Sequence, residues 1–225
     1  MKNLALILVL AACLLGCGGK GTQIKRDSTV YAPDTDTTFT DRRDGKVYKI
    51  VKIGRQTWFA ENLNYAAEGS WCYKNIADSC AKYGRLYTWE TALTACPAGT
   101  HLPTAIEWAA LVDYAGGAKT AGQKLKSTSG WNSRNGVSGN GSDDYGFSAL
   151  PGGGCFIWVN YYSRYFYHIG NRGFWWSATD VNNDAALAWC REIVFDADDA
   201  NRSDDNKMDR YSVRCVLDDE KERRK

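Results

Sequence analysis

The sequence predicts an α+β domain with few short helices, antiparallel strands and long ordered loops. Apolar and polar residues alternate on both sides of Gly54-Arg55, which predicts a β-hairpin of Val47 to Ile53 and Gln56 to Ala60. Helical patterns are short and early, in "YTWETALTA" after Thr88 and again after Thr104. Because strand-like segments dominate the second half, helices and strands are segregated along the chain, as in α+β folds.

The second helix carries its own start and stop signals. Thr104 and Glu107 form the S/T-x-x-E pattern of a capping box, and apolar residues follow it from Trp108. Gly116-Gly117 is expected to end this helix. The carboxylate of Glu107 is therefore assigned to the backbone N–H of Thr104, a structural task.

The later part of the chain reads as loops and strands. The segment from Gly116 to Gly154 is rich in Gly, Ser and Asn and predicts a long ordered loop around one short strand, Gly146 to Leu150. Two further strands are expected in "AALAWCREIVF" and "RYSVRCVL". The acidic segment "DADDANRSDDNKMD" is expected to be the loop that joins them.

The N-terminus predicts export and lipid anchoring. Residues 1–16 contain Lys2 followed by an apolar run, and "LLGC" resembles the lipobox of bacterial lipoproteins, which makes Cys17 the acylated residue. An ordinary signal peptide cut elsewhere is the alternative. Since Gly18 rather than Asp follows Cys17, the comparison with enterobacterial lipoproteins favours the outer membrane of the cell envelope, on either face. We expect a tether over 17–43, the domain over 44–218 and a charged tail over 219–225.

Charge and composition argue against several partners. The formal net charge is only +2, and no basic stripe stands out, which argues against nucleic acid. The chain has two histidines, His101 and His168, and no CxxC pair, so neither a His-rich nor a zinc-ribbon metal site is expected.

Six cysteines remain once Cys13 leaves with the signal and Cys17 is acylated. An even number in an exported protein implies disulfides, although six cysteines allow fifteen connectivities. Cys72 and Cys80 flank the short segment "CYKNIADSC" and form the natural local pair. Cys96 with His101 could be a nucleophile and its base, but we interpret Cys96 as half of a disulfide, because an exported thiol would oxidise. The six are Cys72, Cys80, Cys96, Cys155, Cys190 and Cys215.

Several motifs, in one order along the chain, resemble a known family. They are "DGKVYKIVKIGRQTWFAENLNY", "YGRLYTWETAL", "CPAGTHLPTAIEWAAL", "YGFSALPGGG", "GFWWSATD" and "YSVRCV". Together they resemble the Fibrobacter succinogenes major paralogous domain, a family of exported, often lipid-anchored bacterial proteins. The resemblance implies a C-type-lectin-like fold, which formylglycine-generating enzymes share, and no established activity. It also implies a disulfide between Cys96 and Cys215, which leaves Cys155 and Cys190 as the third pair.

We expect a non-catalytic binding module for carbohydrate or another surface ligand, such as a surface protein. Tyrosine rings can stack on sugar faces, while amides and carboxylates hydrogen-bond to hydroxyl groups. Trp175 and Trp176 are expected to be framework instead. The candidate contact residues are Tyr161, Tyr162, Tyr165 and Tyr167, with Asn140, Asp143 and Asp144 in a neighbouring loop.

Three alternatives stay open. The first is calcium, which prefers hard oxygen ligands such as those of the acidic segment, although the EF-hand pattern is absent and a solvated loop is favoured. A structural envelope protein without a small ligand is the second. The third is an enzyme related to the formylglycine-generating folds, for which no Ser-His-Asp or Cys-His arrangement is supported. The calcium candidates are Asp196, Asp198, Asp199 and Asn201, with Asp204 and Asp205.

Overall fold

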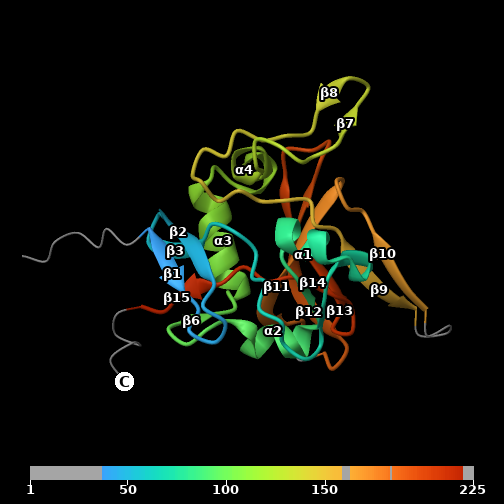
Figure 1. Cartoon of the computed structure of the whole chain (residues 1–225). Coiled ribbons are helices and arrows are strands. Elements are labelled where there is room, and N and C mark those ends of the chain that lie inside the picture. The colour runs from blue at the N-terminus through green and yellow to red at the C-terminus, as the bar shows by residue number, and fades with distance from the viewer. Residues whose placement is uncertain (1–36, 159–162, 183, 220–225) are drawn as a thin grey trace, which may run out of the picture. The chain divides into compact units, whose positions relative to one another are not determined.

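A computed structural model describes residues 37–158, 163–182 and 184–219 (Figure 1). Its helices are short and lie in the first half of the domain, so the predicted α+β class is confirmed. None of the described helices is long and apolar enough to cross a membrane. The helices are the 3₁₀ turn η1 (Tyr73–Asn75), α1 (Ala77–Tyr83), α2 (Trp89–Ala95), α3 (Ala105–Tyr114) and α4 (Ala118–Leu125).

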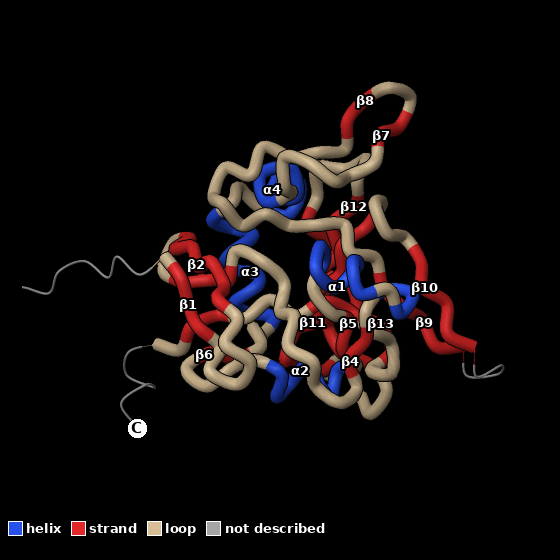
Figure 2. Tube along the Cα trace, in the orientation of Figure 1, coloured by secondary structure: helices blue, strands red, loops and turns tan. Residues whose placement is uncertain are grey.

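The strands form two main sheets, whose pairings are antiparallel except between β11 and β14. The larger sheet has the order β13 (Ala200–Asn206), β12 (Leu187–Val194), β11 (Arg172–Asp180), β14 (Tyr211–Ser212), β5 (Leu86–Tyr87) and β4 (Ser70–Trp71). The smaller has the order β1 (Thr38–Thr40), β2 (Val47–Ile53), β3 (Gln56–Phe59), β15 (Val216–Leu217) and β6 (Thr100–His101). Two separate ribbons pair β9 (Gly154–Trp158) with β10 (Ser163–Tyr167), and β7 (Ser133–Arg134) with β8 (Val137–Ser138) (Figure 2).

The local start signals read from the sequence are confirmed. The side chain of Thr88 accepts a hydrogen bond from the backbone N–H of Thr91 at the start of α2. At the start of α3, Thr104 and Glu107 form both hydrogen bonds of the capping box. The predicted hairpin is β2–β3. In addition, β1 pairs with β2, so the sheet already includes residues 38–40 of the segment assigned to the tether.

Four local predictions are wrong. Helix α4 lies in the predicted long loop. The expected strand at 146–150 is reduced to a single bridge between Ala149 and Lys126. The segment "RYSVRCVL" divides into β14 and β15, which belong to different sheets. Part of the acidic loop is β13, whose polar side chains fit an edge strand.

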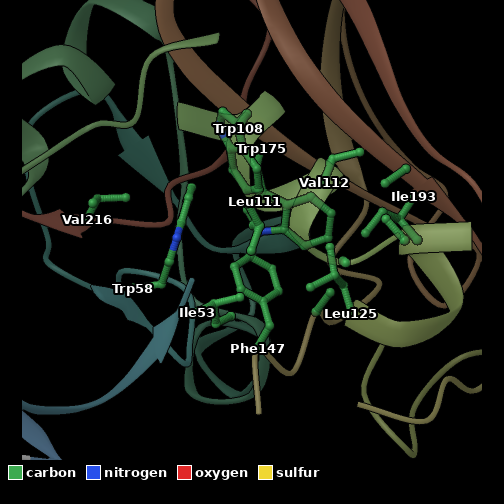
Figure 3. Close-up of a cluster of buried hydrophobic side chains, with 14 of the residues drawn as sticks. Ile53, Trp58, Trp108, Leu111, Val112, Leu125, Phe147, Trp175, Ile193 and Val216 are labelled. Atoms are coloured by element: carbon green, nitrogen blue, oxygen red, sulfur yellow. The ribbon is translucent and has the colours of Figure 1, made fainter. Parts of the chain in front are cut away.

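Two large apolar clusters fill most of the core, and neighbouring residues of β11 contribute to both. Trp175 points into the cluster that α3 and α4 cover, with Trp58, Trp108 and Phe147 (Figure 3). Trp176 points the other way, into a cluster with Tyr87 and Tyr211. Successive strand residues face opposite sides of a sheet, so one Trp-Trp pair serves both clusters. Both indoles are 0% exposed, as expected of framework residues.

Two of the three predicted disulfides are present. Cys72–Cys80 closes the local segment, and Cys96–Cys215 joins residues 119 apart in sequence. The prediction of a Cys155–Cys190 disulfide is wrong, because no disulfide joins these two buried residues. Cys155 lies in β9 and packs with Tyr73 and Leu86, whereas Cys190 lies in β12 and belongs to the cluster around Trp176. An even number of cysteines does not show whether two of them lie close enough in space to form a bond.

Candidate ligand-binding site

The β9–β10 ribbon presents aromatic rings on one face. Phe156 lies directly opposite Tyr165, and Gly154 lies opposite Tyr167. Because directly opposed residues of an antiparallel pair share a face, and residues two apart along a strand also share it, Phe156, Tyr165 and Tyr167 lie on the same side. We call these three residues the aromatic face. The ribbon stands at the side of the domain away from the smaller sheet (Figure 1).

The base of the aromatic face is fixed in the core. The ring of Tyr167 stacks on Phe156 with centroids 3.7 Å apart and planes inclined by 5°. Its hydroxyl lies 3.2 Å from that of Tyr211, and burial raises the pKa of Tyr167. Tyr167 is therefore a packed residue at the foot of the predicted site. It is not a freely offered ring.

Tyr165 differs from Tyr167 because it remains 61% exposed. It lies two residues before Tyr167 in β10, directly opposite Phe156. Tyr161 and Tyr162 lie outside the described residues. Among the four predicted tyrosines, Tyr165 is thus the described ring that offers its surface to a ligand.

The opposite side of the ribbon is also held in place. Phe166 packs against Tyr73 at 5.2 Å between ring centroids. The backbones of Cys155 and Arg210 exchange two hydrogen bonds, of 3.1 and 3.0 Å. Further out, the N–H of Ile157 donates to Oδ1 of Asp209 at 2.9 Å. These contacts make the ribbon a rigid support as far as Ile157.

Two carboxylates accompany the aromatic face, and the sequence did not assign them to it. Burial raises the pKa of Asp209 to about 6 and also raises the pKa of Asp205. Both carboxylates interact electrostatically with Tyr167, which contributes to its raised pKa. The Cys190 thiol donates to Oδ2 of Asp205 at 3.2 Å. All residues from Asn201 to Asn206 are polar, so the sequence of β13 carries no alternation that would have indicated a strand.

The other predicted contact residues, Asn140, Asp143 and Asp144, make hydrogen bonds that hold their own loop in place. Oδ1 of Asn140 accepts the backbone N–H of Trp131, and Asp143 accepts both the N–H and the hydroxyl of Ser148 at 2.7 and 2.6 Å. Asp144 is exposed, but its N–H bonds to the carbonyl of Lys124 in α4. The loop is therefore fastened to α4, which Figure 1 shows apart from the labelled strands β9 and β10. The structure does not join the two parts of the predicted site.

The acidic segment has its own partners within the chain. Asp196 pairs with Arg134, and Asp199 accepts a hydrogen bond from Asn201. The ammonium group of Lys126 donates to the carbonyls of Phe195 and Ala197 at 3.3 and 3.0 Å, with a third contact to Val194 at 3.5 Å. A lysine therefore occupies the carbonyl cluster of this turn. In the part of the chain that the structure describes, no group of three or more His, Cys, Asp or Glu is arranged to hold a metal ion.

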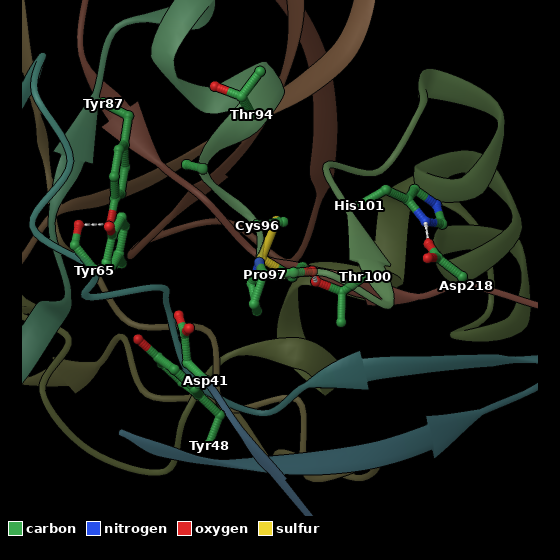
Figure 4. The surroundings of a disulfide bond; sticks show 12 residues. Asp41, Tyr48, Tyr65, Tyr87, Thr94, Cys96, Pro97, Thr100, His101 and Asp218 are labelled. Carbon is green, nitrogen blue, oxygen red and sulfur yellow. Dashed lines mark hydrogen bonds and ion pairs between the residues drawn. A yellow bond between two sulfur atoms is a disulfide. The ribbon is translucent and has the colours of Figure 1, made fainter. Parts of the chain in front are cut away.

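The stretch around Cys96 and His101 is structural, as its sequence predicts. Cys96 is half of a disulfide. Nδ1 of His101 lies 2.7 Å from Asp218, and Nε2 lies 2.7 Å from Glu107 (Figure 4 draws the Asp218 contact). These hydrogen bonds raise the pKa of His101 to about 9, with Glu107 as the main cause. Both ring nitrogens are engaged, so this imidazolium clasps the last strand to α3 and offers no free base.

The His101 clasp predicts a specific loss of stability at alkaline pH. Since the pKa of His101 is raised from its ordinary 6.5 to about 9, its stabilisation is complete below pH 6.5 and disappears as the pH rises through 9. The side chain is 34% exposed, so we discount the effect to about 1–2 kcal/mol. Thermal melting of the wild type and of His101→Gln should differ most near pH 6 and converge by about pH 10. A constant difference across this range would contradict the prediction.

Comparisons with known proteins identify a family for this chain. Neither the curated proteins nor the solved structures contain a match. The family model of the Fibrobacter succinogenes major domain matches residues 51–217, which include most of both sheets and all four α-helices. The chain therefore belongs to the Fibrobacter succinogenes major domain family.

Proposed function

We propose that the protein is a lipid-anchored protein of the cell envelope whose domain is a non-catalytic binding module for carbohydrate. The observation that carries this proposal is the ring of Tyr165, which is 61% exposed. It stands on a ribbon whose base is held in place by the stack of Phe156 on Tyr167. The lectin-like kinship implied by the family resemblance is consistent with it.

The physical argument rests on preorganisation. An exposed tyrosine offers apolar area to the C–H groups of a sugar, and its hydroxyl remains at the rim to hydrogen-bond. Because the backbone beneath Tyr165 is already fixed, binding orders few additional groups and so loses little conformational entropy. The carboxylate of Asp205, partly exposed beside Tyr167, can accept hydrogen bonds from sugar hydroxyls.

Tyr165→Ala is expected to weaken polysaccharide binding at least tenfold, about 1.4 kcal/mol, with little change in melting temperature. The matched control is Tyr114→Ala, since Tyr114 is 56% exposed and lies on α3, outside the ribbon. Binding would be measured by affinity electrophoresis against cell-wall and plant polysaccharides. If the two variants lose binding equally, or if Tyr165→Ala unfolds, the ribbon is not the contact surface.

The anchor part of the proposal rests on "LLGC" at the end of the apolar run. A cysteine that carries two or three acyl chains holds a protein stably at a membrane, whereas one chain binds only marginally. Cys17→Ser should leave the precursor uncleaved or release the protein from the membrane fraction. Fractionation and mass spectrometry measure both outcomes. Normal maturation of this variant together with full membrane retention would exclude acylation at Cys17.

A further inference from the structure

We propose that Cys72–Cys80 is a redox-reactive disulfide, opened by a dithiol reductant of the cell envelope through thiol–disulfide exchange. The observation is the position of Arg85, whose Nη1 lies 3.7 Å from the sulfur of Cys72 and 3.7 Å from that of Cys80. A guanidinium group is permanently charged. One cation therefore faces both sulfurs of the bond.

Arg85 is held in this position by a neighbouring strand. Its Nε donates to the hydroxyl of Ser70 at 2.8 Å, and its Nη2 donates to the carbonyl of Ser70 at 3.1 Å. The Ser70 hydroxyl in turn donates to the carbonyl of Ala67 at 2.6 Å. These contacts use two of the guanidinium nitrogens and leave Nη1 directed at the disulfide. The cation is thus already in place when a thiolate forms.

The two sulfurs differ in solvent exposure, and this decides which sulfur is attacked and which one leaves. Cys72 is partly exposed, whereas Cys80 is 6% exposed. The thiolate of the reductant attacks Sγ of Cys72, a mixed disulfide forms, and Sγ of Cys80 leaves with the electron pair of the broken bond. The second thiol of the reductant, once deprotonated, then attacks the mixed disulfide and releases Cys72 as a thiolate. Two electrons pass to the protein, and the reductant ends as its own disulfide.

Arg85 accelerates the first step because a nearby cation favours the anionic form of the leaving sulfur, and a better-stabilised leaving thiolate departs faster. Cys96–Cys215 also joins a partly exposed cysteine to a buried one, but its buried sulfur, that of Cys215, lies in the apolar core cluster around Trp176. The two disulfides of the described domain therefore divide between a reactive bond and a structural bond.

The reactive disulfide lies behind the aromatic face. Tyr73 follows Cys72 directly, and its ring packs on Phe166 on the back of the β9–β10 ribbon. The enclosed segment is also weakly fastened, since neither η1 nor α1 has a side-chain cap at its N-terminus. Opening the bond therefore acts on the small cluster of Tyr73, Leu86 and Cys155 behind the ribbon, and not on the two large core clusters.

The test measures the rate at which dithiothreitol opens each disulfide in the full chain, by alkylation of the new thiols and peptide mapping. In the wild type, Cys72–Cys80 should open at least tenfold faster than Cys96–Cys215. Arg85→Gln should slow the opening of Cys72–Cys80 by about three- to tenfold, because the leaving thiolate loses its cation. Arg85→Lys keeps the charge, so its rate of opening should lie between those of the wild type and Arg85→Gln.

The opposite sign would overturn the proposal. If Arg85 serves only to pack this segment, Arg85→Gln loosens the disulfide, and reduction becomes faster. An unchanged rate contradicts the proposal equally. Should Arg85→Gln fail to fold, the order of opening in the wild type still decides, since Cys96–Cys215 opening first or at the same rate excludes a specially reactive Cys72–Cys80.

Discussion

Trp176→Ala is expected to lower the free energy of unfolding by about 3–5 kcal/mol, the usual range for removing a fully buried tryptophan. The ring of Trp176 lies 4.5 Å from that of Tyr211, and its Nε1 donates to the carbonyl of Tyr87 at 2.8 Å. The substitution therefore opens a cavity and also leaves that buried carbonyl without its donor. Both effects act on the cluster that supports Tyr167 and the ribbon.

A second tryptophan of the same sheet supplies the control. Trp189 in β12 is partly exposed, and the guanidinium of Arg202 lies 4.1 Å above its ring. An exposed cation–π contact contributes only about 0.5–1 kcal/mol, so Trp189→Ala should cost far less than Trp176→Ala. Urea unfolding of both variants measures the difference. Equal losses would show that Trp176 is not the core residue that the structure makes it.

Removing the Cys96–Cys215 disulfide is expected to cost about 4–5 kcal/mol, because the bond closes a long loop and so restricts the unfolded chain. The sequence separation is 119 residues, against 8 for Cys72–Cys80. The same relation gives about 2–3 kcal/mol for the shorter loop. The two double variants to alanine, Cys96→Ala with Cys215→Ala and Cys72→Ala with Cys80→Ala, should rank in that order.

Chemical unfolding of the two double variants under identical conditions measures this ranking. The variant without the shorter disulfide is the control, because it also lacks two sulfur atoms and is purified and unfolded in the same way. A greater loss for Cys72–Cys80 would mean that local packing around Arg85, and not loop closure, dominates the stabilisation by these bonds. It would also contradict a reactive, weakly structural role for Cys72–Cys80.

The features that could be predicted from sequence are those set by neighbours in the chain. The Thr104–Glu107 capping box and the β2–β3 hairpin depend on residues a few positions apart, and both were found as expected. The Cys96–Cys215 disulfide came from the family resemblance, and the structure confirms it.

The features that could not be predicted from sequence depend on tertiary packing. Gly122 lowers the helical signal of α4, yet a Cβ there would lie 2.2 Å from the carbonyl oxygen of Asp199, so close packing requires the glycine. The sequence treated Tyr165 and Tyr167 alike as contact residues, and only the stacking of Phe156 on Tyr167 separates the packed ring from the exposed one. The polar residues of β13 form a strand because β12 pairs with them, which composition cannot reveal.

Binding of the full chain, solubilised in detergent, to a panel of cell-wall and plant polysaccharides tests the central claim most directly. The wild type and Tyr114→Ala should bind at least one polysaccharide, with or without EDTA, since Lys126 already occupies the carbonyl cluster of the acidic turn. Tyr165→Ala should bind it at least tenfold more weakly while melting at the same temperature. Wild-type affinity in Tyr165→Ala, or no binding by the wild type to any member of the panel, would contradict the carbohydrate-binding account.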